Sequence, residues 1–242
     1  MITPLQAKDK IILPLDVPDE AAALRLVRQL AGTVSFFKVG LELFTRCGPG
    51  VIDRVRRAAR EDGGADARVF LDLKLHDIPN TVAGAVRAAA ALEVDFLTVH
   101  LSGGAAMLGA ALAEAGEKTL LLGVSVLTSS DAATLAETGV PASVAEQVSR
   151  LAALGFDNGV RGVVASAHEA AALRARFGSA LTLVVPGVRP AAGAMDDQRR
   201  IMTPRQALAA GADYLVIGRP ITAQPDPRAA AEEIVRELET PS

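Results

Sequence analysis

Residues 70–82, FLDLKLHDIPNTV, place three charged side chains of mixed sign at the end of an apolar run: Asp72, Lys74 and Asp77. On an extended strand, residues two apart project to the same side, so we expect Asp72 and Lys74 to face the same way. Asp77 comes three residues later, after the apolar run has given way to a loop. Its expected partner across the array is Lys38. The four charges therefore alternate in sign.

This array suits a reaction that passes through a carbanion-like transition state. An opposite charge nearby favours the charged form of a side chain, so Lys38 and Lys74 are expected to stay protonated between the two carboxylates. A protonated lysine cannot form a Schiff base, which needs a free amine. It can stabilise developing negative charge and deliver a proton.

Eight short apolar runs alternate along the chain with amphipathic stretches that have helical spacing. The predicted strands cover residues 10–16, 34–40, 68–74, 95–100, 119–127, 161–166, 181–187 and 213–218. Clear helical stretches cover residues 19–31, 49–61 and 143–155. Such alternation is typical of parallel βαβ units that are buried on both faces. We predict a (β/α)8 TIM barrel; a doubly wound open sheet is the alternative, because sequence alone does not show closure.

Length and composition agree with one cytoplasmic barrel domain over residues 1–242, since such barrels commonly have about 250 residues. The net charge of -3 disfavours a nucleic-acid partner. No apolar run reaches the roughly 18 residues of a membrane span, and the N-terminal stretch has charges where a signal peptide is apolar. Cys47 is the only cysteine, which excludes an internal disulfide, and we expect it to be buried or interfacial.

In a barrel of this kind, catalytic residues lie at the carboxyl ends of the strands. Asp16 follows the first predicted strand, Lys38 ends the second, Asp72 and Lys74 end the third, and Thr128 follows the fifth. A solvated rim would explain any one of these residues. Their convergence on one rim favours an active site.

The last two strand ends have the residues of an anion site. Gly187 and Arg189 follow the seventh predicted strand, and Gly218 and Arg219 follow the eighth. Barrels often bind phosphate with these two loops, and glycine allows the backbone to approach the anion closely. The stretch 191–204 between them is either a lid that closes on the phosphate or an ordinary surface loop.

Seven motifs, in this order, resemble bacterial (type 1) orotidine 5'-phosphate decarboxylases over nearly the whole chain. They are LDVP (15–18), FKVG (37–40), FLDLKLHDIPNTV (70–82), LTS (127–129), PGVRP (186–190), DDQRR (196–200) and IGRPI (217–221). The short Asp-x-Lys-x-x-Asp core occurs in related barrels as well, whereas the extended DLKLHDIPNT is far more specific.

The resemblance implies decarboxylation of orotidine 5'-phosphate to uridine 5'-phosphate, without metal or organic cofactor. Lys74 would protonate C6 of the pyrimidine after carbon dioxide leaves. Asp72 would lie beside the substrate carboxylate, and Lys38 would bridge Asp72 and the ribose. Asp16 would bind the ribose hydroxyls.

The resemblance also implies a homodimer, because Asp77, Ile78 and Thr81 would reach into the partner subunit's site. Thr128 would contact the pyrimidine ring. The residues that would hold the phosphate are Arg189, Gln198, Gly218 and Arg219.

Two other functions fit parts of the sequence. Metal-dependent sister barrels, such as hexulose-phosphate synthases, share the Asp-x-Lys-x-x-Asp core and use magnesium held by carboxylates. Residues 78–86 contain no acidic residue, which leaves such a site short of ligands. A phosphate-binding sensor would not need the charged array. His76 is expected to pack or hydrogen-bond, His100 to be structural or at the rim or dimer interface, and His168 to be on the surface.

Overall fold

The computed structural model describes residues 6–61, 66–190 and 202–240. Its strands pair in parallel as one closed barrel, in the order in which they occur along the chain. This confirms the predicted fold class and excludes the open sheet. The strands are β1 (Ile11–Pro14), β2 (Phe36–Gly40), β3 (Arg68–Leu75), β4 (Phe96–His100), β5 (Leu120–Val124), β6 (Gly162–Val164), β7 (Thr182–Pro186) and β8 (Tyr214–Val216).

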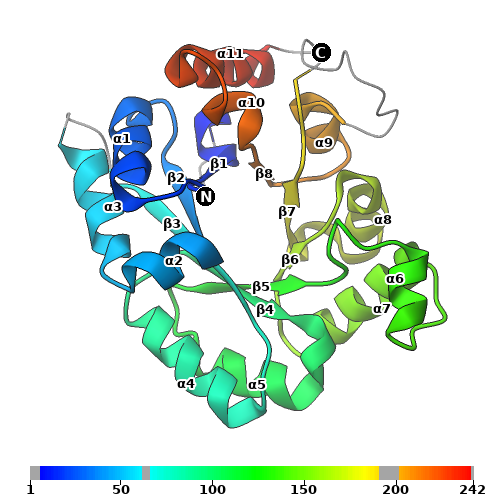
Figure 1. Cartoon of the computed structure of the whole chain (residues 1–242). Helices are drawn as coiled ribbons and strands as arrows, with labels where there is room; N and C mark the ends of the chain where they lie inside the picture. Colours follow the sequence, from blue (N-terminus) through cyan, green and yellow to red (C-terminus); the bar gives the residue numbers. More distant parts are fainter. Residues whose placement is uncertain (1–5, 62–65, 191–201, 241–242) are drawn as a thin grey trace. The chain divides into compact units, whose positions relative to one another are not determined.

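Helices connect the strands, and several connections carry a second helix or a 3-10 turn (Figure 1). The α-helices are α1 (Glu20–Leu30), α2 (Leu41–Cys47), α3 (Val51–Arg60), α4 (Pro79–Ala90), α5 (Gly104–Glu114), α6 (Ala132–Glu137), α7 (Val144–Asp157), α8 (Ala167–Phe177), α9 (Pro204–Ala209), α10 (Arg219–Thr222) and α11 (Pro227–Glu239). The 3-10 turns are η1 (Ala7–Lys10), η2 (Leu101–Gly103) and η3 (Gly178–Ala180).

Polar side chains fix where several helices begin. Asp19 caps α1, because its carboxylate accepts the N–H of Ala22 at 2.7 Å. Ser143 and Glu146 form a reciprocal capping box at the start of α7. The helices predicted from their amphipathic spacing are confirmed as α1, α3 and α7.

Every predicted strand is present, but most are shorter than the apolar run that predicted them. Leu15, for example, is fully buried although β1 ends at Pro14. Burial of both strand faces extends beyond the hydrogen-bonded ladder, so apolar residues alone predict strands that are too long.

Contacts divide the chain into two compact units, and the first comprises Met1–Asp72, Gly187–Ala209 and Asp213–Ser242. Within it, β1 pairs with both β2 and β8, and β2 pairs with β3. Helix α11 packs against α1, α9 and α10 (Figure 1). The buried rings of Phe36 and Phe37 on β2 are among the largest side chains of this core.

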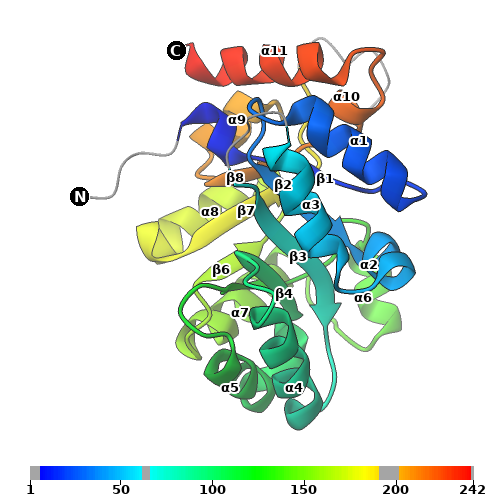
Figure 2. The ribbon, with the colours of Figure 1, turned by 90° about the vertical axis from the view of Figure 1, so that its left-hand side faces the viewer.

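The second unit comprises Leu73–Pro186 and Ala210–Ala212. Strands β4 to β7 pair consecutively in it, and α4 packs alongside α5 (Figure 2). Arg87 of α4 joins Glu114 of α5 through two hydrogen bonds of 2.7 and 2.8 Å. In the part of the chain that the structure describes, no helix is both long and apolar enough to cross a membrane.

Candidate active site

Lys38 of β2 lies between two carboxylates of the first unit. Its Nζ is 3.1 Å from Oδ1 of Asp16 and 3.5 Å from Oδ2 of Asp72. The strand register explains this arrangement: Gly40 pairs with Asp72, and Lys38 lies two residues before Gly40 on the same strand face. β2 ends at Gly40, where the predicted strand 34–40 also ends, so Lys38 lies two residues before the strand end.

Burial differs between the two carboxylates. Lys38 and Asp72 are each only 9% exposed, whereas Asp16 is exposed. Buried charges interact more strongly than charges in water, so the Lys38–Asp72 pair is a fixed electrostatic feature at the carboxyl end of the sheet. Fixed charges of this kind can stabilise charge that develops on a substrate, because they need no reorganisation during the reaction.

Gly40 provides the space that this charged pair occupies. A β-carbon at Gly40 would lie 3.1 Å from Nζ of Lys38 and 3.2 Å from Oδ1 of Asp16. Such contacts are tighter than nearly all real β-carbon contacts. A side chain at position 40 would therefore require the Lys38 ammonium or the Asp16 carboxylate to move by a few tenths of an ångström.

Lys74 has an unusual backbone conformation. Its φ is +51°, in the left-handed region, and its N–H donates to Oγ1 of Thr98 on β4 at 2.9 Å. The prediction that Lys74 and Asp72 project to the same side assumed a regular strand; the φ of Lys74 departs from that geometry, so the common direction stays a prediction. β3 extends to Leu75, so Asp72 and Lys74 both lie near its end, as expected from the predicted strand 68–74.

Asp77, Ile78 and Thr81 lie where β3 leads into α4, and all three are exposed. The Ile78 side chain is unusually open, with 66% of the residue accessible. Its N–H donates to Oδ1 of Asp77 at 2.6 Å, so the two residues form a compact local turn.

The other residues singled out in the second unit lie in loops, at a strand end and in helix α8. Thr128 is exposed in the loop after β5. The rings of His76 and His100 pack together, with centroids 5.3 Å apart, which agrees with a packing role for His76. His168 is exposed on α8, as predicted.

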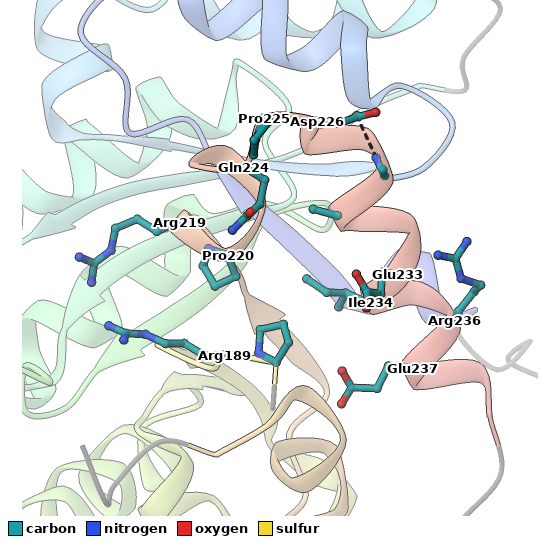
Figure 3. A pocket seen from close by; sticks show the side chains of 13 residues that line it. Arg189, Arg219, Pro220, Gln224, Pro225, Asp226, Glu233, Ile234, Arg236 and Glu237 are labelled. Atoms are coloured by element: carbon teal, nitrogen blue, oxygen red, sulfur yellow. Dashed lines mark hydrogen bonds between the residues drawn. The ribbon is translucent and has the colours of Figure 1, made fainter. Parts of the chain in front are cut away.

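Two arginines of the first unit border one cavity of about 980 Å³ (Figure 3). Arg189 follows β7, where its N–H donates to the Met202 carbonyl at 3.2 Å, and Arg219 begins α10. Figure 3 shows both guanidinium groups extending to the same side, away from α11. Guanidinium groups match phosphate in charge and in hydrogen-bonding geometry.

Two glycines shape these loops. Gly187 has a φ of +79°, which side chains rarely adopt. A β-carbon at Gly218 would lie 3.0 Å from Cγ of Pro14, so the backbone passes close to β1 at this point. Gln198 and residues 191–201 of the predicted lid lie outside the described residues. The end of the predicted stretch 191–204 leads into α9. Thr203 and Gln206 hydrogen-bond reciprocally around the first turn of this helix.

Cys47 is half-buried at the end of α2. Burial, and after it the negative charge of Glu20, raises the pKa of its thiol. The thiol is therefore protonated and a poor nucleophile at neutral pH. Within the described residues, no group of three His, Cys, Asp or Glu side chains is placed to hold a metal ion.

A family model described as "Orotidine 5'-phosphate decarboxylase / HUMPS family" matches residues 9–234. The chain belongs to this family. An orotidine 5'-phosphate decarboxylase of Moorella thermoacetica is 52% identical over 97% of this chain and 94% of its own length. One from Thermobifida fusca is 51% identical over 95% of each chain.

A solved structure gives the same answer for the fold. The crystal structure of orotidine 5'-phosphate decarboxylase from Lactobacillus acidophilus superposes with a TM-score of 0.82 at 35% identity, over 96% of this chain and all of that one. The resemblance inferred from the motifs is confirmed, and with it the prediction of an enzyme.

Two residues of the site were missed in the sequence. Gly40 stands inside the motif FKVG, but a glycine at a strand end does not reveal that a lysine and a carboxylate lie over it. Thr98 is the residue with a hydroxyl in the strand Phe96–His100, and it is completely buried. The sequence signal for Thr98 was a hydroxyl side chain within a mostly apolar predicted strand.

Proposed function

We propose that this chain decarboxylates orotidine 5'-phosphate to uridine 5'-phosphate in de novo pyrimidine biosynthesis, without a metal or organic cofactor. The observation that carries the proposal is the position of the Lys38 ammonium between the carboxylates of Asp16 and Asp72. The relatives from Moorella and Thermobifida, which match this chain nearly from end to end, are named for this activity.

The reaction breaks the bond between C6 and the carboxylate carbon, and the electron pair stays on C6. This vinyl-type anion is barely delocalised by the ring, so the protein must stabilise it. The Lys74 ammonium does so and then donates a proton to C6, which leaves a neutral amine that solvent reprotonates. Carbon dioxide is the other product.

Three charged residues of the first unit hold the substrate in place. Asp72 lies beside the substrate carboxylate, and Lys38 bridges Asp72 and the ribose. Asp16 is exposed and can therefore meet the ribose hydroxyls directly. The short contact of Lys38 with Asp16 supports this arrangement, because it keeps both groups oriented before substrate binds.

The phosphate binds to the two arginine loops, at Arg189, Gly218 and Arg219, together with Gln198. Binding energy from this remote group can be used to orient the pyrimidine for the reaction at C6. The common direction of the two guanidinium groups in Figure 3 supports this role.

The active form is a cytoplasmic homodimer of single-domain subunits, with no nucleic-acid or membrane partner. Asp77, Ile78 and Thr81 extend into the partner subunit's site, while Thr128 contacts the pyrimidine of its own subunit. The exposure of Ile78 supports this assignment, because a solvent-facing isoleucine is stabilised when a second subunit covers it.

The variant Lys74→Ala tests the role of the proton donor. It should abolish measurable turnover and leave the affinity for uridine 5'-phosphate within about threefold of the parent, because Lys74 acts mainly in the transition state. Lys118→Ala is the matched control, since Lys118 is exposed and pairs only at the surface with Glu93 at 3.3 Å. Near-normal turnover of Lys74→Ala would sink the assignment.

A further inference from the structure

We propose that Thr98 is a positioning residue that holds the backbone of Lys74 in its left-handed conformation and so aims the Lys74 ammonium. The inference rests on the proposed function of Lys74 as proton donor. It concerns a residue of β4 that has no role in the mechanism described above.

The first observation is the burial of Thr98. The residue is 0% exposed within the apolar strand Phe96–His100. Burying a hydroxyl is unfavourable unless it is hydrogen-bonded, and valine would fill nearly the same volume without that requirement. The Thr98 Oγ1 accepts the Lys74 N–H at 2.9 Å, which gives the buried oxygen a specific partner.

The second observation is the conformation of Lys74. A φ of +51° is uncommon for a lysine, because its β-carbon crowds the backbone there. Residues in such conformations persist only when their surroundings hold them, and they gather at functional sites. The hydrogen bond to Thr98 is an interaction of the strained residue's own backbone, so it acts directly on this conformation.

The direction of the Cα–Cβ bond follows from the backbone conformation. In a regular strand it alternates between the two faces, whereas the left-handed φ of Lys74 changes that direction. If the backbone returned to the extended region, the start of the lysine side chain would move and the ammonium would move with it. Displacement by about 1 Å can reduce a catalytic rate about a hundredfold.

The test compares Thr98→Val, which removes the acceptor, with Thr98→Ser, which keeps it. Thr98→Val should lower kcat by about 10- to 100-fold and leave KM within about threefold, because phosphate binding is untouched. Thr98→Ser should keep kcat within about threefold of the parent. If Thr98→Val fails to fold, Thr98→Ala carries the same expectation.

Thr119→Val is the matched control. Thr119 is also buried, at 6% exposure, and its hydroxyl donates to the Val94 carbonyl at 2.7 Å, just before β4 begins. The substitution Thr119→Val removes a buried hydrogen bond just before the start of β4. It should lower stability without changing kcat, and this separates positioning from general destabilisation.

Hydrogen–deuterium exchange at the Lys74 amide gives a readout that does not depend on activity. The amide should exchange faster in Thr98→Val than in the parent or in Thr98→Ser. Unchanged exchange and unchanged kcat in Thr98→Val would overturn the proposal, as would a Thr98→Ser variant as slow as Thr98→Val. If the parent itself does not decarboxylate the substrate, the proposed function fails, and amide exchange still decides whether Thr98 holds Lys74.

Discussion

The ammonium of Lys38 lies 3.1 Å from the carboxylate of Asp16, and the two groups meet in the space where a side chain at Gly40 would begin. Lys38 of β2 and Asp16, which follows β1, therefore meet beside a residue that has no side chain. The role of this glycine of the FKVG motif can therefore be tested by substitution.

Gly40→Ala should disturb this pair, because the new β-carbon would approach both polar atoms to within 3.2 Å. We expect kcat/KM to fall about 10- to 100-fold, as for other small displacements of catalytic groups. Steady-state kinetics on the purified variant measure this.

Gly109→Ala is the control for that change. Gly109 lies within α5, and a β-carbon there would meet nothing within 4 Å. It should keep parental kinetics and gain about 0.5–1 kcal/mol of stability, because alanine favours helix over glycine. Parental kinetics in Gly40→Ala would show that the Lys38–Asp16 contact is dispensable.

Mixing two inactive variants tests whether Asp77 acts across the subunit interface. Lys74→Ala and Asp77→Ala should each be inactive alone, whereas their heterodimer has one site with both residues intact. Co-refolded mixtures should therefore regain up to about a quarter of parental activity for random pairing of subunits. Heterodimers that are demonstrably formed but inactive would place Asp77 in its own subunit's site.

Arg219→Ala should raise KM by about 10- to 100-fold, since a hydrogen bond to a charged group contributes about 1.5–3 kcal/mol. Orotidine, which lacks the phosphate, should be processed equally poorly by the parent and by this variant. Arg236→Ala is the control, because Arg236 lines the same cavity from α11. A similar loss on orotidine would mean that Arg219 acts somewhere other than the phosphate.

Stability in acid should depend on Glu114. The hydrogen bond from Arg87 holds the pKa of Glu114 below its ordinary value of 4.5. A lowered pKa in the folded state means that the charge stabilises the fold above pH 4.5, and that this contribution disappears as the pH falls through the folded-state pKa.

Glu114→Gln should therefore be slightly less stable than the parent at pH 7, and the difference should shrink as the pH falls below 4.5. Urea unfolding at several pH values measures it. A pH-independent difference for Glu114→Gln would rule out the charge as the cause.

The fold could be predicted because it depends on repeated patterns. Eight apolar runs and the amphipathic helices between them are visible in the sequence, and each becomes an element of the barrel. Strand ends were less accurate, because buried residues such as Leu15 continue past the ladder. Apolar residues indicate that a segment is buried, but they do not show which of its residues pair with the neighbouring strand.

The site was predicted as a set of residues but not as a geometry. The types and order of Asp16, Lys38 and Asp72 indicated charges at strand ends, and the structure brings these three together. The left-handed backbone of Lys74 could not be predicted, and neither could the hydrogen bond from its N–H to a residue of another strand. Local sequence carries no signal for such a contact.

The most direct test of the proposed function is the ultraviolet absorbance of orotidine 5'-phosphate mixed with purified protein and excess EDTA. The account predicts a fall in pyrimidine absorbance with release of carbon dioxide at an unchanged rate when EDTA is present. Turnover that appears only after magnesium is added would contradict the cofactor-free mechanism. No turnover under either condition would contradict the assignment of this substrate.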